Sequence, residues 1–178
     1  VAIGPREVTA PHTPGHTRGH LVFRDARAGL LFAGDHVLPH ITPSIGFEPA
    51  RLESPLRAYL ASLALIRAMP DALLLPAHGP ATASVHARVD ELLAHHTQRL
   101  DETLRALENG ADTAYAVAAQ LGWTRRRTRL DDLDPFNQVL AILETVAHLE
   151  VLIERGHVSG ADVDGIRHYR VGRASSEG

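Results

Sequence analysis

The segment HTPGHTRGH, residues 12–20, places three histidines at intervals of four. A spacing of four would put these histidines on one face of an α-helix. Pro14 and Gly15 make a helix unfavourable here, because proline removes a backbone hydrogen bond and glycine adds backbone entropy. The flanking stretches REVTAP and HLVFRD alternate or run apolar with β-branched residues, as strands do. The segment is therefore predicted to be a loop between two strands, a common location for metal ligands.

Composition limits the class of protein. A chain of 178 residues with 44% hydrophobic content has room for one average domain or two small ones with a real core. No apolar run approaches the roughly 20 residues that cross a bilayer, and the start does not resemble a signal segment, so a soluble cytoplasmic protein without a membrane partner is expected. With no cysteine and twelve histidines, any metal would be held by imidazole and carboxylate groups. The arginine-only basic content and the abundant alanine indicate a GC-rich bacterial genome.

The first half of the chain alternates strand signals with one helix. The stretches HLVFRD and GLLFAGD flank a short ARA connection, which predicts an antiparallel hairpin. Residues 55–69, PLRAYLASLALIRAM, carry apolar residues at helical spacing and end at Pro70. Residues 72–75 form a short apolar run that leads into another histidine-containing loop, and we expect a buried strand there.

From about residue 83 the pattern becomes helical. Three helices within 84–110, 112–123 and 134–156 are predicted, followed by a β-hairpin over 157–172. The third helix has clear boundaries, with Asp134 as N-cap, Pro135 at the first position and Gly156 as the stop. Three helices and a hairpin make a winged-helix outline.

Three predicted loops carry candidate metal-binding or catalytic residues. His16 lies in TPGHTRGH, Asp35 in FAGDHVL and His78 in LLLPAHGP, each at the carboxyl end of a predicted strand or in the loop that leaves it. Ligands gather at that edge of layered α/β architectures, so we expect the three side chains to converge. A single loop histidine is usually an ordinary polar residue, so only the three residues together indicate a site.

These three segments resemble the third, fourth and fifth motifs of the metallo-β-lactamase superfamily. The stretch GDHVLPHITPSIG is similar to the branch that contains β-lactamase-like endoribonucleases and bacterial hydrolases, and the last part of the chain resembles the winged helix associated with that fold. The resemblance implies an α/β fold: the C-terminal half of an αββα sandwich over residues 1–82, followed by a small winged-helix domain over residues 83–178.

The resemblance also implies roles for individual residues. His16 matches the third histidine of the first zinc site, Asp35 the catalytic carboxylate that bridges two zinc ions, and His78 the remaining histidine of the second site. Imidazole and carboxylate are ordinary zinc ligands. His20 and His36 are expected to support them, since a ligand histidine needs a partner for its other ring nitrogen.

The chain departs from the family pattern in one major respect. The family's H-x-H-x-D-H motif supplies four of seven ligands, and this sequence contains no H-x-H at all. We therefore expect the chain to be the C-terminal portion of a longer protein, without the first half of the sandwich. Half a sandwich leaves an apolar sheet face and strand edges uncovered, so self-association through the exposed sheet is expected.

Two classes of function follow. In the first, the full-length parent is a zinc hydrolase with two ions, whose metal-activated water attacks an ester, a thioester or a phosphodiester in a small-molecule or RNA-like substrate. The chain alone would then have partial or no zinc and would be inactive. In the second, the chain is a non-catalytic binding or oligomerisation module whose winged helix contacts a partner.

The arginine cluster TRRRTR, residues 124–129, is a candidate nucleic-acid contact in a winged helix. Charge argues against duplex DNA, because residues 83–178 carry 11 arginines and 15 acidic residues, a net charge of −4. A local role for the cluster near the active site stays open.

Overall fold

The computed structural model describes residues 2–4, 6–48 and 53–172. The chain divides into two compact units, Val1–His96 and Thr97–Gly178. The division falls inside helix α2, Val85–Glu108, so this helix contributes residues to both units. The predicted domain boundary at residue 82 lies just before this helix.

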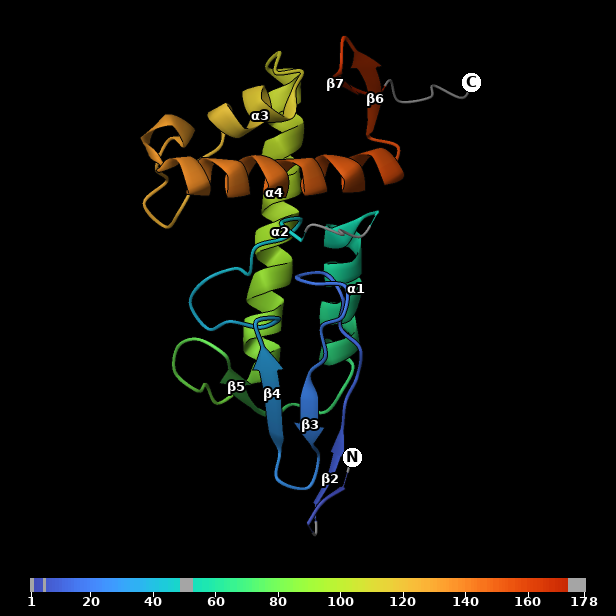
Figure 1. Cartoon of the computed structure of the whole chain (residues 1–178), viewed down its shortest axis with the longest axis vertical. Helices are drawn as coiled ribbons and strands as arrows, with labels where there is room; N and C mark the ends of the chain where they lie inside the picture. Colours follow the sequence, from blue (N-terminus) through green and yellow to red (C-terminus); the bar gives the residue numbers. More distant parts are fainter. Residues whose placement is uncertain (1, 5, 49–52, 173–178) are drawn as a thin grey trace. The chain divides into compact units, whose positions relative to one another are not determined.

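The first unit is built on a five-stranded sheet with the strand order β1-β2-β3-β4-β5 (Figure 1). The strands are β1 Ala2–Ile3, β2 Arg6–Thr9, β3 Phe23–Asp25, β4 Leu30–Gly34 and β5 Leu73–Pro76. Neighbouring strands from β1 to β4 are antiparallel, and β5 pairs parallel with β4. The predicted hairpin is confirmed, with Phe23 opposite Phe32.

Helix α1, Pro55–Arg67, connects β4 to β5 and confirms the helix predicted over residues 55–69. It begins on a proline at its first turn, a position where the missing N–H costs nothing. Its apolar residues recur at helical spacing and are buried, Tyr59 and Leu63 completely. The Tyr59 Oη donates a hydrogen bond of 2.9 Å to the carbonyl of His36, which ties the loop after β4 to the helix.

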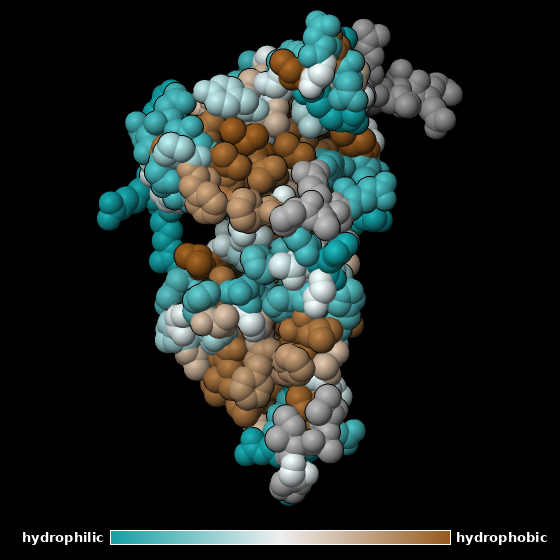
Figure 2. Space-filling view, viewed as in Figure 1, coloured by the Kyte–Doolittle hydropathy of each residue, from teal (hydrophilic) through white to brown (hydrophobic). Residues whose placement is uncertain are grey.

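The two faces of the sheet differ in exposure. Leu31, Ala33 and Leu74 are buried on one face. On the other face Phe23 and Phe32 form an exposed cross-strand pair, and Leu73 on β5 is exposed beside them. Figure 2 shows an apolar patch over these strands. The part of this face formed by Phe23, Phe32 and Leu73 is uncovered in the described part of the chain.

The second unit contains the remaining helices and a two-stranded sheet. Its elements are the end of α2, then α3 Ala114–Gln120, the 3₁₀ turn η1 Leu130–Asp132, α4 Pro135–Glu154, β6 Val158–Val163 and β7 Ile166–Val171. The predicted cap of α4 is confirmed, because Asp134 accepts hydrogen bonds of 3.1 Å from the backbone N–H groups of Phe136 and Asn137. The hairpin is confirmed as well, and it turns at Asp164 and Gly165, both in the left-handed region. The winged-helix identity stays a prediction.

Helix α4 departs from the expectation that no apolar run approaches the length needed to cross a bilayer. It is 20 residues long, and by length and composition alone it is apolar enough to cross a membrane. Leu149, Val151 and Leu152 are buried in the second unit, and the core helix of a soluble protein passes the same test. The finding is therefore weak evidence for a membrane span.

Candidate active site

The sheet topology explains how the three predicted site residues reach one edge. Asp35 directly follows β4, and His78 lies two residues after β5. Because β4 and β5 are parallel, their carboxyl ends lie at the same edge. Strand β2 runs in the same direction as β4, since both are antiparallel to β3, so the loop with His16 leaves from this edge too. Three loops distant in sequence therefore start from one side of the sheet.

Asp35 and His78 are in direct contact. The His78 Nε2 lies 3.2 Å from the Asp35 Oδ1, and the two side chains are 71% and 38% exposed. The backbone of Gly79 has φ +89° and approaches Pro39 so closely that an added Cβ would lie 2.7 Å from its Cγ. The loop after β5 is thus pressed against the loop after β4, which brings these two side chains together. A contact this exposed adds little stability, and its role is to hold the two groups near each other.

His16 is held by the backbone of a distant segment. Its Nδ1 lies 2.9 Å from the carbonyl oxygen of Ser44. A carbonyl can only accept, so Nδ1 carries the proton, and in the neutral ring Nε2 keeps its lone pair. This is the tautomer in which a histidine binds a metal through Nε2 while its other nitrogen is fixed by a hydrogen bond.

His20 lies among the other site residues. Its ring rests on Gly34, where an added Cβ would come within 2.8 Å of Nε2, and its Nδ1 lies 3.0 Å from the Thr13 Oγ1. Burial lowers the pKa of His20, the nearby His16 lowers this pKa further, and the carboxylate of Asp35 raises it. His16 and Asp35 are therefore both close enough to His20 to affect its titration.

His36 is fully buried between two rings. Its centroid lies 5.4 Å from that of His20 and 4.8 Å from that of Tyr59. Burial lowers the pKa of His36 to about 3, so the ring is neutral at physiological pH. Among the described residues neither ring nitrogen has a hydrogen-bond partner. Orphaned buried nitrogens are costly, which makes His36 an unusual feature of this edge.

The predicted supporting role of His20 and His36 stays a prediction. In the described part of the chain, the group that orients His16 is the Ser44 carbonyl, and the group beside His78 is Asp35. Sequence reasoning missed Ser44 because it acts through its backbone. It also missed Tyr59, whose place in an apolar helical pattern is the same as that of any core residue.

The donor types suit a metal, but their number does not. Within residues 2–4, 6–48 and 53–172, no three His, Asp or Glu side chains form a group able to hold an ion. Asp35 and His78 contact each other, and His16 offers a separate Nε2. A zinc site takes at least three protein ligands. The described residues therefore do not fit a complete metal site by themselves.

The fold and these side chains define a class: an α/β protein with imidazole and carboxylate donors at the carboxyl ends of its strands. The family model of the metallo-beta-lactamase superfamily matches residues 1–78, which include His16, Asp35 and His78. The chain belongs to the metallo-beta-lactamase superfamily through this segment. The resemblance seen in the sequence is confirmed.

Curated relatives include hydrolases from fungi and bacteria. An atrochrysone carboxyl ACP thioesterase of Paecilomyces divaricatus is 28% identical over 158 residues, which cover 83% of this chain and 48% of the relative. A "probable metallo-hydrolase" of Bacillus subtilis is 26% identical over 143 residues, which cover 78% of this chain and 42% of the relative. The chain thus spans about half the length of these relatives or less. A bacterial source stays a prediction, because the relatives include fungal proteins.

Two solved structures resemble most of the chain. A beta-lactamase domain protein of Burkholderia ambifaria matches with a TM-score of 0.83 and 31% identity, over 97% of this chain and 50% of that protein. A metallo-beta-lactamase family protein of Thermus thermophilus matches with a TM-score of 0.78 and 29% identity, over 96% of this chain and 51% of that protein. Both similarities extend beyond residue 78 into the second unit.

Proposed function

We propose that this chain supplies part of the active site of a metal-dependent hydrolase that cleaves an acyl thioester or a related ester. Membership of the metallo-beta-lactamase superfamily supports hydrolysis as the reaction. The thioester is favoured over a phosphodiester because two of the curated relatives are named as acyl carrier protein thioesterases. Fold similarity alone would not distinguish these substrates.

One observation carries the proposal: three potential metal donors leave one edge of the sheet from three separate loops. His16 is oriented by a backbone carbonyl so that Nε2 is available, and Asp35 lies 3.2 Å from His78. Chance placement of polar residues gives no reason for this convergence, whereas a site built at strand ends does.

We further propose that zinc is the metal and that residues outside these 178 complete its ligands. The donors here are imidazole and carboxylate, which zinc accepts, and the chain contains no H-x-H segment. The described residues alone do not form a group that holds an ion. On this proposal the 178-residue chain has little or no tightly bound zinc and no turnover. The full-length protein binds zinc tightly and turns over substrate.

The test compares the 178-residue chain with a full-length protein that carries an H-x-H-x-D-H segment. Zinc is measured by elemental analysis, and hydrolysis is followed with a simple acyl thioester and a simple phosphodiester. The substitutions His16→Ala, Asp35→Asn and His78→Ala in the full-length protein are each expected to lower zinc content and to reduce kcat/KM by at least about 100-fold. His157→Ala, at an exposed position after α4, is the control and should change neither.

Each result decides between alternatives. Two tight zinc ions and full turnover in the 178-residue chain would contradict the incomplete site. Faster cleavage of the phosphodiester than of the thioester would contradict the substrate class. A full-length protein that binds zinc but hydrolyses neither substrate would favour the second candidate, a non-catalytic binding or oligomerisation module, which the incomplete donor set of the described residues also supports.

A further inference from the structure

The arginine-rich segment 124–129 forms a tight, constrained turn in the second unit. The backbones of Trp123 and Thr128 pair in both directions, with N···O distances of 2.8 and 2.6 Å. Within the turn Thr124 has φ +60° and Arg127 has φ +53°, in the left-handed region where non-glycine residues are uncommon. Strained residues of this kind persist where the surroundings hold them, and they cluster at functional sites.

Helix α2 holds the turn through Arg99. This side chain donates a hydrogen bond of 3.1 Å to the carbonyl of Gly122, and its guanidinium lies 4.7 Å from the centre of the Trp123 ring. Arg99 also pairs at 3.2 Å with Glu102, whose other oxygen lies 3.5 Å from the Nη1 of Arg127. The position of Arg127 is thus set by a chain of contacts from the helix.

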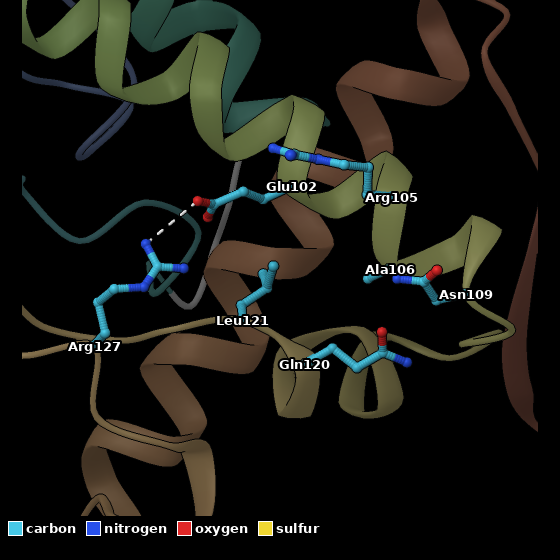
Figure 3. Close-up of a pocket in the computed structure, with 7 residues that line it drawn as sticks. All are labelled: Glu102, Arg105, Ala106, Asn109, Gln120, Leu121 and Arg127. Carbon is cyan, nitrogen blue, oxygen red and sulfur yellow. Dashed lines mark hydrogen bonds and ion pairs between the residues drawn. The ribbon is translucent and has the colours of Figure 1, made fainter.

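Beside this turn the second unit has a cavity of about 160 Å³ (Figure 3). Arg105 lines it from α2, Asn109 from the position after that helix, Gln120 from the end of α3, and Arg127 from the turn. The volume corresponds to about ten water-sized positions, which is enough for a polar group of several atoms. The site is therefore formed by three separate segments.

Several side-chain donors that line the cavity are solvent-exposed and have no protein partner among the described residues. The Nε of Arg105 donates to the carbonyl of Asp101 at 3.2 Å, but in the described part of the chain its two terminal nitrogens have no partner. The side-chain amides of Asn109 and Gln120 likewise have none among the described residues. The geometry therefore offers donors without matching acceptors.

The charge of the lining is positive. The negative charge of the Glu102 carboxylate is already compensated, because it pairs with Arg99 at 3.2 Å and accepts a hydrogen bond of 3.0 Å from Gln98. Its contact with Arg127 is longer, at 3.5 Å. The lining thus carries two arginines, at positions 105 and 127, and one carboxylate. An anion that enters the cavity meets excess positive charge as well as free donors.

We propose that this cavity binds a phosphate group of a small molecule, through Arg105 and Arg127 with help from Asn109 and Gln120. The planar guanidinium matches phosphate oxygens with two parallel hydrogen bonds. The net charge of −4 on residues 83–178 disfavours a long polyanion, so the ligand is a small molecule and not a nucleic acid. The site is independent of the proposed hydrolase, since it depends only on residues of the second unit.

The probe is inorganic diphosphate, titrated into the 178-residue chain at low salt and followed by NMR and calorimetry. We expect saturable binding that shifts the side-chain amide signals of Asn109 and Gln120. Arg105→Gln should weaken binding about tenfold, the effect of one lost charge-assisted hydrogen bond. Arg127→Asn should do the same, and asparagine tolerates the left-handed backbone. Arg126→Gln, an exposed arginine of the same turn outside the cavity, is the control and should change binding less than about twofold.

Several outcomes would overturn the proposal. One is the absence of saturation by about 10 mM diphosphate. Another is an equal loss of affinity in Arg126→Gln, which would indicate nonspecific attraction to the turn. Tighter binding of succinate than of diphosphate at matched ionic strength would reject the phosphate class. If Arg127→Asn does not fold, as judged by circular dichroism, Arg105→Gln decides alone, because its one described side-chain bond is to its own helix.

Discussion

At the scale of single residues, the loop that carries His16 depends on Gly15. This glycine has φ +140°, and an added Cβ would lie 2.4 Å from the Cβ and 2.5 Å from the Cα of Tyr59. Backbone atoms of a helix cannot move aside as a flexible side chain does. The close approach keeps the neighbouring His16 at its place near the sheet edge.

Gly15→Ala is therefore expected to destabilise the chain by at least about 2 kcal/mol, from overpacking and an unfavourable backbone conformation. Gly19→Ala is the matched control in the same loop, since its added Cβ meets nothing within 4 Å. Urea unfolding measures both changes in the free energy of unfolding. Equal stabilities of the two variants would contradict the close contact with Tyr59.

A second expectation at this scale concerns His36. Two buried ring nitrogens without described partners cost about 1–3 kcal/mol each in the extreme case, so His36→Leu should stabilise the 178-residue chain by about 1 kcal/mol. The same unfolding measurement applies, with His40→Leu on the same loop as control. A large loss of stability in His36→Leu would show that the ring has a partner that the described residues do not supply.

At the scale of elements, the start of α2 is tied to the segment that follows α1 by Asp71. Its carboxylate accepts hydrogen bonds from the Ser84 hydroxyl at 2.6 Å and from the His86 backbone N–H at 3.0 Å. The hydrogen bond from Ser84 is the main cause that lowers the pKa of Asp71 to about 2. The arrangement acts as a cap at a helix start that carries no acidic residue in its first turn.

Asp71→Ala should therefore destabilise the chain by about 1 kcal/mol at neutral pH. The pKa of Asp71 is lower in the folded chain than the ordinary 3.8, so this stabilisation is complete above about pH 4 and is lost as the pH falls toward about 2. Chemical unfolding at several pH values measures the effect. Ser84→Ala should remove part of the same stabilisation, because it removes the same hydrogen bond. If the losses of unfolding free energy of Asp71→Ala and Ser84→Ala simply add in the double variant, the shared interaction is contradicted.

Helix boundaries show how far local sequence suffices at this scale. Asp134, Pro135 and Gly156 predicted α4 within two residues of its observed ends, because caps and stops act over one helical turn. The hairpin β6-β7 follows in the same way from its Asp164-Gly165 turn. The division into two compact units falls inside α2, one continuous helix, and no local sequence signal marks that point.

At the scale of the whole molecule, the uncovered sheet face is the main feature without a partner in the described part of the chain. Phe23, Phe32 and Leu73 are 42%, 44% and 38% exposed on neighbouring strands. Adjacent exposed apolar side chains of this size favour association. We assign the expected self-association of the 178-residue chain to these three exposed side chains.

We expect the chain to form dimers or larger species at micromolar concentrations and Phe32→Gln to shift the equilibrium toward monomer by about tenfold. Leu65→Gln is the matched control, because Leu65 is also 44% exposed but lies on α1. Sedimentation velocity measures both. A monomeric wild-type chain, or an equal effect of the two substitutions, would contradict association through this face.

The sequence by itself determined the main helices, most strands and the family, because hydrophobic period, caps, turns and motif order are properties of neighbouring residues. It also identified His16, Asp35 and His78 as the residues to examine. Only the tertiary structure decided what surrounds them. The contact between Asp35 and His78 joins residues 43 positions apart and depends on the parallel pairing of β4 with β5.

The remaining features depend on tertiary structure in the same way. The tautomer of His16 is set by the carbonyl of Ser44, which is 28 positions away and has no sequence signature. The isolation of the His36 ring and the cavity beside Arg127 arise where separate segments pack together. A side chain's protonation and its free hydrogen-bonding capacity depend on every group that packs around it, and those groups are brought there by the fold of the chain.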